Sequence, residues 1–189
     1  MTEICPHEQC TGCTACASAC PKHAISMQRD EWGFLYPQVD GDSCLHCGLC
    51  QKVCPAQNKP GQRNILEEER FRIAWHREEE VRAKSSSGGA FSALASAVLR
   101  RGGHVCGAAF REDYHAVHHL IIHREEELPQ LRSSKYLQSD MGQTYAEVKA
   151  LLTEGEEVLF AGTPCQVAGL RLFLRKEYPN LITLDIVCH

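Results

Sequence analysis

Hydrophobic residues in the second half of the chain recur with the period of an α-helix in three places. They predict helices over residues 90–99, 143–153 and 163–178. We expect one of the serines at 85–87 to cap the first helix, and Gly102 and Gly103 to end it. Thr163 is the expected cap of the third helix, with Pro164 in its first turn. One face of the second helix carries Tyr145, Val148 and Leu152.

Runs rich in apolar and β-branched residues alternate with these helices and predict strands. They cover residues 71–76, 104–110, 115–123, 157–162 and 180–188. The run at 157–162 is apolar throughout, which is typical of a buried strand. Because a strand, a helix and a strand follow one another from residue 157 onward, this half is expected to be α/β. In the first half, alternation at Phe34, Tyr36 and Val39 predicts short strands.

A polar stretch with proline and glycine separates the two halves. Its sequence at 57–64, QNKPGQRN, offers nothing to bury and is typical of a linker. We therefore expect a first domain over residues 1–60, a linker over 61–70 and a second module over 71–189. The second module ends at the close of an apolar strand, where natural domains seldom stop, so we expect it to be truncated.

Composition and charge argue against several classes of protein. The 189 residues carry 20 Lys and Arg against 24 Asp and Glu, and the net charge of −4 does not suit a nucleic-acid or anionic-membrane surface. The longest nearly apolar stretch, residues 90–99, is half the length of a membrane span of about 20 residues. The start, MTEICPHEQC, lacks the basic and apolar regions of a signal peptide. We expect a cytoplasmic protein with no membrane span and no nucleic-acid partner.

Twelve cysteines carry the main candidate chemistry, and a reducing cytoplasm argues against disulfides. Eight of them form two runs of the pattern C-x2-C-x2-C-x3-C-P, and each position of the second run lies 34 residues after its counterpart in the first. The first run is Cys10, Cys13, Cys16 and Cys20, and the second is Cys44, Cys47, Cys50 and Cys54. This repeated pattern is the one with which bacterial ferredoxins bind 4Fe-4S clusters.

The spacing within each run predicts how the thiolates are shared. Three thiolates two residues apart wrap a tight loop around a cluster, and the N–H groups of that loop favour the negative charge of the cluster. The fourth cysteine lies too far along to close the same cube and binds the other cluster instead. One cluster is therefore expected on Cys10, Cys13, Cys16 and Cys54, and the other on Cys44, Cys47, Cys50 and Cys20.

The alternative metal is zinc, but a tetrahedral zinc site uses two C-x2-C pairs and leaves the third cysteine of each run without a role. Residues from about Cys5 to Gln57 resemble the two-cluster bacterial ferredoxins, on the motifs CTGCTACASACPKHAI and CLHCGLCQKVCPAQN. Cys5 itself lies outside the pattern and is expected to be a bystander. The expected fold class is α+β, with a small ferredoxin-like 2x 4Fe-4S domain followed by an incomplete α/β domain.

Three places in the second module could carry further chemistry. The run SSSGG at 85–89 opens a helix, where it serves as a cap or binds an anionic group. Cys165 stands near a helix N-terminus, where the dipole favours a thiolate, although a free cysteine is often a small buried hydrophobe. Cys188 follows the next parallel strand, so the two thiols are expected to converge at one sheet edge as half of a cluster site.

The remaining cysteine and the histidines of this module are given structural roles. Cys106 lies inside a predicted strand and is expected in the core. Partly exposed strand residues, rather than metal ligands, are the expectation for His115, His118, His119 and His123.

The second module is similar to the beta subunits of coenzyme F-420 hydrogenases and dehydrogenases. The stretches that carry this resemblance are SSSGGAFSALASAVLRRGGHVCGAAF, SSKYLQSDMGQTYAEVKALLTEGEEVLFAGTPCQVAGL and NLITLDIVCH. The family implies FAD, and it implies Cys165 and Cys188 as ligands of a third 4Fe-4S cluster. It also continues into a C-terminal domain that would complete the cluster and flavin sites. Residues expected near the flavin are Ser87, Gly88, Ser134, Lys135 and Tyr136.

Two functions follow from these observations. The first is an iron–sulfur electron-transfer component of a flavin-linked oxidoreductase, which relays electrons between 4Fe-4S clusters and a flavin, a deazaflavin or another reducible substrate. It requires a redox partner protein, and the sequence assigns it no catalytic residue and no substrate. The alternative is a non-catalytic ferredoxin-type carrier whose second module only docks to a partner.

Overall fold

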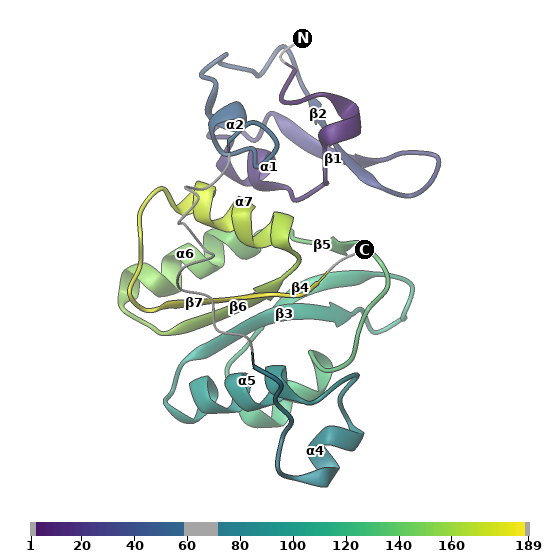
Figure 1. Ribbon diagram of the computed structural model, residues 1–189. Coiled ribbons are helices and arrows are strands. Elements are labelled where there is room, and N and C mark those ends of the chain that lie inside the picture. The colour runs from purple at the N-terminus through teal and green to yellow at the C-terminus, as the bar shows by residue number, and fades with distance from the viewer. Residues whose placement is uncertain (1–2, 59–71, 188–189) are drawn as a thin grey trace.

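Figure 1 shows the computed structural model, which describes residues 3–58 and 72–187. A small N-terminal part packs against one side of a larger part that contains a five-stranded sheet. The linker expected at 61–70 and the candidate ligand Cys188 lie outside the described residues.

The N-terminal part consists of a hairpin and short helical turns that carry the cysteines. β1 (Ile25–Arg29) pairs antiparallel with β2 (Leu35–Val39), which confirms the short strands predicted from the alternation in this region. The carboxylate of Asp30 accepts hydrogen bonds from the N–H groups of Trp32 and Phe34 and so fixes the turn between the strands. The helical turns are η1 (His7–Gln9), α1 (Ala15–Ala19) and α2 (Leu49–Lys52).

The larger part is organised around a mixed sheet with the order β5-β4-β3-β6-β7. β3 and β4 form an antiparallel pair, and all other neighbours are parallel. The parallel pairing of β6 with β7 through α7 confirms the predicted βαβ unit. The strands are β3 (His104–Phe110), β4 (Val117–Ile122), β5 (Ser139–Asp140), β6 (Val158–Gly162) and β7 (Leu181–Asp185).

Helices cover both faces of this sheet. α6 and α7 lie on the face toward the N-terminal part, and α5 lies with η2 on the opposite face (Figure 1). The three long helices confirm the three predicted from the hydrophobic period. Their bounds, with those of two shorter elements, are α4 (Glu79–Ala83), α5 (Ala90–Arg100), η2 (Glu125–Gln130), α6 (Thr144–Glu154) and α7 (Pro164–Leu174).

Two expectations about local structure are wrong. The described part of the strand predicted at 71–76, residues 72–76, forms no strand, and its apolar side chains Ile73 and Trp75 face solvent. Its backbone is held by the neighbouring loop instead, since the N–H of His76 donates to the carbonyl oxygen of Gly88. The third helix ends at Leu174 rather than at residue 178, because the next residue, Arg175, adopts the left-handed backbone conformation with a φ of 59°.

Two expectations about single side chains are also wrong. No serine caps α5, since its N-cap is Gly89 at a φ of 82°, and the hydroxyl of Ser85 donates to a carbonyl one turn earlier. His119 is not partly exposed but 6% exposed, and its ring stacks on that of Phe160. Cys106 is fully buried, as predicted.

Within residues 3–58 and 72–187, no helix is long and apolar enough to cross a membrane. Each of the longest helices, such as α5, has 11 residues, about half of what a span requires.

Candidate iron–sulfur centres

The eight cysteines of the two runs line two pockets of the N-terminal part. Cys10, Cys13, Cys16 and Cys54 line the first pocket, and Cys20, Cys44, Cys47 and Cys50 line the second. The pockets are of similar size, about 340 and 400 Å³ with their open mouths included, as expected of a repeat. Each run therefore contributes its fourth cysteine to the pocket of the other run.

The backbone of each run turns through two left-handed residues, which wrap it around its pocket. Gly12 and Thr14 have φ angles of 64° and 62°, and their counterparts in the repeat, His46 and Gly48, have 51° and 70°. Left-handed residues alternating with others turn successive N–H groups toward one side and create a site for an anion. A left-handed non-glycine residue costs roughly 1–3 kcal/mol. Thr14 and His46 therefore adopt a backbone conformation that their residue types disfavour, in the two loops that wrap the pockets.

Burial and mutual repulsion oppose ionisation of the first set of thiols. Burial raises the pKa of Cys13 to about 11; the N–H of Ala15 acts in the opposite direction, and the thiols of Cys165 and Cys54 add to the rise. Burial likewise raises the pKa of Cys16, and Cys13 strengthens that effect. Thiols packed in this way ionise together only where a positively charged centre neutralises them, which iron binding does.

The donor sets fit 4Fe-4S clusters. Each set supplies four thiols, the coordination of a cubane cluster, and backbone N–H groups already point at two of the sulfurs. The N–H of Ala24 lies 3.3 Å from the sulfur of Cys20, and that of His46 lies 3.4 Å from the sulfur of Cys44. Among the described residues, no three His, Cys, Asp or Glu side chains converge closely enough for one metal ion. The thiols thus surround each pocket instead of meeting at one point, as a zinc ion would require.

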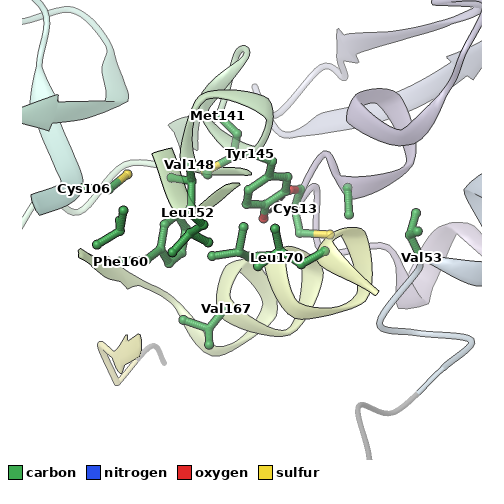
Figure 2. Packing of buried hydrophobic residues seen from close by; sticks show 13 residues of the cluster. Cys13, Val53, Cys106, Met141, Tyr145, Val148, Leu152, Phe160, Val167 and Leu170 are labelled. Atoms are coloured by element: carbon green, nitrogen blue, oxygen red, sulfur yellow. Dashed lines mark hydrogen bonds between the residues drawn. The ribbon is translucent and has the colours of Figure 1, made fainter. Parts of the chain in front are cut away.

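The first pocket lies against the larger part of the molecule. Figure 2 shows Cys13 beside Tyr145 and Leu170, where one buried cluster of side chains continues from the sheet into the cysteine loop. The hydroxyl of Tyr145 lies 3.0 Å from the carbonyl oxygen of Cys13 and 2.9 Å from that of Gln166. A Cβ on Gly169 would stand 3.0 Å from the Tyr145 hydroxyl and 3.2 Å from the Cβ of Ala15, so the glycine of α7 permits this close approach.

A second contact across the same interface comes from Gln138, just before β5. Its side-chain oxygen accepts a hydrogen bond of 2.8 Å from the N–H of Leu35, and its amide nitrogen donates to the carbonyl oxygen of Thr11 at 3.3 Å. A Cβ on Gly12 would collide with this amide and with the carbonyl oxygen of Leu35, which would be 2.6 Å away. The loop of the first cysteine run is therefore fitted to the larger part as well as to its own pocket.

Buried polar side chains lie behind this interface. The Nε2 atom of His119 is 3.2 Å from the carbonyl oxygen of Ala161, which can only accept, so Nε2 carries the proton and Nδ1 accepts. The hydroxyl of Ser139 lies 3.0 Å from that Nδ1 and accepts from the side-chain amide of Gln166 at 2.9 Å. Burial lowers the pKa of His119 to about 4, so the imidazole is neutral near pH 7.

The same chain of hydrogen bonds continues to Cys165. The side-chain oxygen of Gln166 accepts a hydrogen bond from the N–H of Thr163. The hydroxyl of Thr163 lies 3.1 Å from the Cys165 sulfur. Thr163 caps α7 and Pro164 opens it, as predicted. The N–H of Ile186 donates to the carbonyl oxygen of Gly162, so the chain behind β7 runs beside this turn. Convergence of Cys165 with Cys188 stays a prediction, since Cys188 lies outside the described residues.

The two segments expected near a flavin lie side by side. The N–H of Ser134 donates to the hydroxyl of Ser86 at 2.8 Å, which joins the segment of Ser134, Lys135 and Tyr136 to that of Ser87 and Gly88. Positive charge gathers here at the start of α5. The guanidinium of Arg132 donates to Ser92 in the first turn of that helix, and the Lys135 amine, whose pKa burial lowers to about 8, donates to the Arg132 carbonyl oxygen at 2.6 Å.

One further cysteine, Cys5, lies close to the first set. It lines the first pocket together with the four cysteines of the set. The pattern of the runs gave no signal for it, because Cys5 precedes the first run by five positions and has no counterpart in the second. The bystander role expected for Cys5 stays a prediction.

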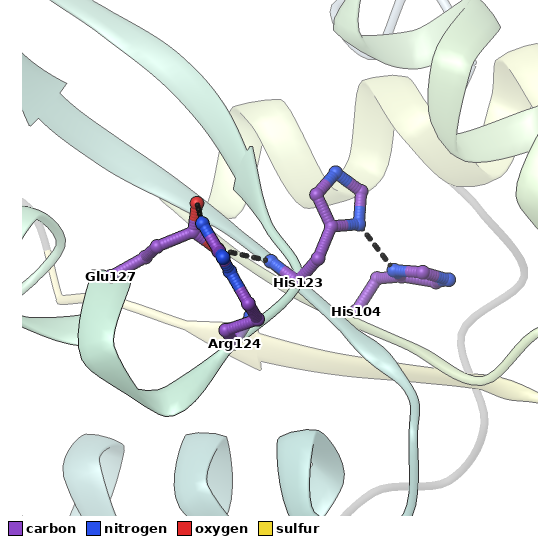
Figure 3. Close-up of polar contacts among 4 residues, drawn as sticks. All are labelled: His104, His123, Arg124 and Glu127. Carbon is purple, nitrogen blue, oxygen red and sulfur yellow. Dashed lines mark hydrogen bonds and ion pairs between the residues drawn. The ribbon is translucent and has the colours of Figure 1, made fainter.

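A pair of histidines at one end of β3 and β4 is the other notable polar cluster (Figure 3). The Nδ1 atoms of His104 and His123 lie 2.6 Å apart, so one ring donates its proton to the other. The Nε2 atom of His104 lies 3.7 Å from a carboxylate oxygen of Glu156. The backbone N–H of His123 donates to Glu127, which also pairs with Arg124. These polar side chains thus have partners within the cluster, and the histidine pair joins β3 to the end of β4.

Comparison with known proteins assigns the N-terminal part. Residues 9–58 match the family of 4Fe-4S dicluster domains. Pyruvate synthase subunit PorD of Thermotoga maritima is 37% identical over 57 residues, which are 30% of this chain and 54% of that protein. An uncharacterized ferredoxin of Methanocaldococcus jannaschii is 36% identical over 52 residues, 28% of this chain and 66% of that protein. The N-terminal part therefore carries a 4Fe-4S dicluster domain.

One similarity extends over both parts. A subunit of the F(420)H(2) dehydrogenase of Methanosarcina mazei is 21% identical over 194 residues, a match that covers 98% of this chain and 54% of that protein. The chain thus spans about half the length of this relative. Together the comparisons support an iron–sulfur electron-transfer role.

Proposed function

We propose that this chain is the iron–sulfur electron-transfer component of a flavin-linked oxidoreductase. It relays electrons between 4Fe-4S clusters and a flavin, a deazaflavin or another reducible substrate. The observation that carries the proposal is the arrangement of the cysteine sets, one of which is packed against the larger part while the other is left at the surface. The relative in Methanosarcina mazei, named as part of a dehydrogenase, adds support.

The ligands in this proposal are the two pocket-lining sets. Cys10, Cys13, Cys16 and Cys54 would hold one cluster, and Cys44, Cys47, Cys50 and Cys20 the other. When bound, such clusters supply one-electron transfer at potentials that the protein tunes. Two features of this chain would tune these potentials: the burial of the thiols, which is greater at the first set, and the N–H groups that point at sulfur.

The two sets differ in what they face. Cys13, Cys16 and Cys54 of the first set are buried, and the Cys13 loop is bonded to Tyr145 on α6. In the second set Cys47 is exposed, and the neighbouring Leu45 presents an apolar side chain to solvent. The second set therefore suits contact with a redox partner protein, and the first suits exchange with the larger part.

In this proposal the flavin binds at the start of α5. No side chain caps this helix, so its free N–H groups remain available to an anion such as the pyrophosphate of FAD. Arg132 and Lys135 add positive charge beside it. Tyr136, 93% exposed, and Trp75, 67% exposed, provide aromatic surface next to these segments. A third 4Fe-4S cluster on Cys165 and Cys188 belongs to the same proposal.

A second candidate is the non-catalytic carrier, in which the larger part only docks the dicluster domain to a partner. It is favoured by the share of the M. mazei protein that this chain covers, 54%, because a flavin pocket could require the remainder. Both candidates place iron in the two cysteine sets and differ only in the flavin.

Flavin content separates the two candidates. The chain is purified without oxygen, incubated with FAD, desalted, and analysed for iron and flavin per protein. About eight irons with one flavin per chain supports the flavin-linked oxidoreductase. About eight irons with no retained flavin contradicts it for this chain and favours the carrier. Zinc in place of iron contradicts both.

A further inference from the structure

We propose that Cys5 is a reserve ligand of the first cluster site, able to take the place of Cys10 or Cys54 on iron. The inference rests on the proposed function in one respect, which is that the first cysteine set binds an iron–sulfur cluster. It adds a ligand that the ferredoxin pattern does not contain.

The two pockets differ in their number of thiols. Five cysteines line the first pocket, Cys5 among them, whereas the four of its own set line the second. Cys5 shares the lining of this pocket with Cys10 and Cys54, and it packs against the small core that contains Cys54. A fifth thiol thus stands beside two of the four ligand positions.

Neighbouring residues hold Cys5 over the pocket. Ile4 is 5% exposed and packs with Cys16 and Cys54 in the small core of the N-terminal part. The side-chain amide of Gln51 donates to the carbonyl oxygen of Glu3 at 2.8 Å. Because both positions before Cys5 are anchored, its sulfur stays near the ligand positions.

The exchange is a simple ligand substitution. One iron–sulfur bond to Cys10 or Cys54 is replaced by one to Cys5, the displaced thiolate takes up the proton that the Cys5 thiol releases, and no oxidation state changes. In a chain that lacks the Cys10 thiol, Cys5 supplies the fourth thiolate directly. The cost is small because the sulfur is already beside the site.

The repeat provides the matched control for a test. Cys10 and Cys44 occupy equivalent positions of the two runs, and only the pocket of Cys10 contains a fifth cysteine. The full chain is prepared without oxygen as wild type, C5A, C10A, C54A, C44A and the double variant C5A/C10A. Iron and acid-labile sulfide per chain are measured, and electron paramagnetic resonance distinguishes 4Fe-4S from 3Fe-4S clusters.

We expect about eight irons in the wild type, in C5A, and in C10A or C54A, and about four irons in C44A and in C5A/C10A. Alkylation followed by mass spectrometry should modify Cys5 in the wild type and leave it protected in C10A. Loss of four irons, or a 3Fe-4S signal, in both C10A and C54A would overturn the proposal. A wild type without iron would instead overturn the proposed function, so the two failures are distinguishable.

Discussion

The hydroxyl of Tyr145 shares its single proton between the carbonyl oxygens of Cys13 and Gln166, at 3.0 and 2.9 Å. One side chain of α6 thereby joins a cysteine loop of the dicluster domain to α7. Tyr145 is fully buried, so both hydrogen bonds are shielded from water.

Removing this hydroxyl should loosen the interface. We expect Tyr145→Phe to lower the free energy of unfolding by about 1–3 kcal/mol, because two hydrogen bonds of a buried hydroxyl are lost. Urea unfolding of the anaerobic protein measures the change. Tyr114→Phe, at a side chain that is 75% exposed, serves as the control and should leave stability unchanged. Equal stabilities of the two variants would show that the hydroxyl does not hold the parts together.

Gly12 is expected to be indispensable to the first site. Gly12→Ala introduces a Cβ at a φ of 64° that collides with the carbonyl oxygen of Leu35, a backbone atom that cannot turn away. We expect iron content to fall to about half. Gly33→Ala is the matched control, since Gly33 also has a positive φ, 85°, but nothing lies within 4 Å of its Cβ. Full iron content in both variants would contradict the tight fit of this loop.

His119 should make stability depend on pH. Its folded pKa of about 4 lies below its ordinary value of 6.5, so the unfolded chain binds the proton more tightly. Stability from this group is complete above about pH 6.5 and is lost as pH falls toward 4. Between pH 7.5 and 5.5, the wild type should lose about 1.4 kcal/mol more than His119→Gln. Urea unfolding at both pH values tests this, and equal losses in both proteins would refute it.

The exposed side of the second cysteine set should control exchange with a partner. Leu45→Glu places a charge on an apolar side chain that is 59% exposed beside this set. We expect the rate of electron exchange with a protein acceptor such as a cytochrome to fall about tenfold, the effect of losing about 1.4 kcal/mol at a contact. Iron content should not change. Trp32→Glu, on the β1–β2 turn, is the control; an equal effect there would argue against a docking site at the second set.

Much of this molecule could be predicted from local patterns. The cysteine runs are local in sequence, and so are the periods that give α5, α6, α7 and the strands of the βαβ unit. The strand predicted at 71–76 was wrong because apolar residues such as Ile73 and Trp75 alternate there but face solvent and pair with no strand. Period alone does not reveal which apolar side chains find a buried face.

The contacts that shape the site were out of reach for a different reason. Gln138 bonds to Leu35 across 103 positions of sequence, and Tyr145 bonds to Cys13 across 132. No sequence motif around Gln138 or Tyr145 predicts such a contact. The proximity of Cys5 to Cys54 arises from the folding of the N-terminal part and not from any spacing in the runs. Tertiary packing decides these relationships.

The central claim is that this chain holds two 4Fe-4S clusters on its two cysteine sets. Iron and acid-labile sulfide per chain, measured together on anaerobically purified wild type, test it most directly. We expect about eight irons and about eight sulfides per chain. About four of each, or zinc without sulfide, would contradict it.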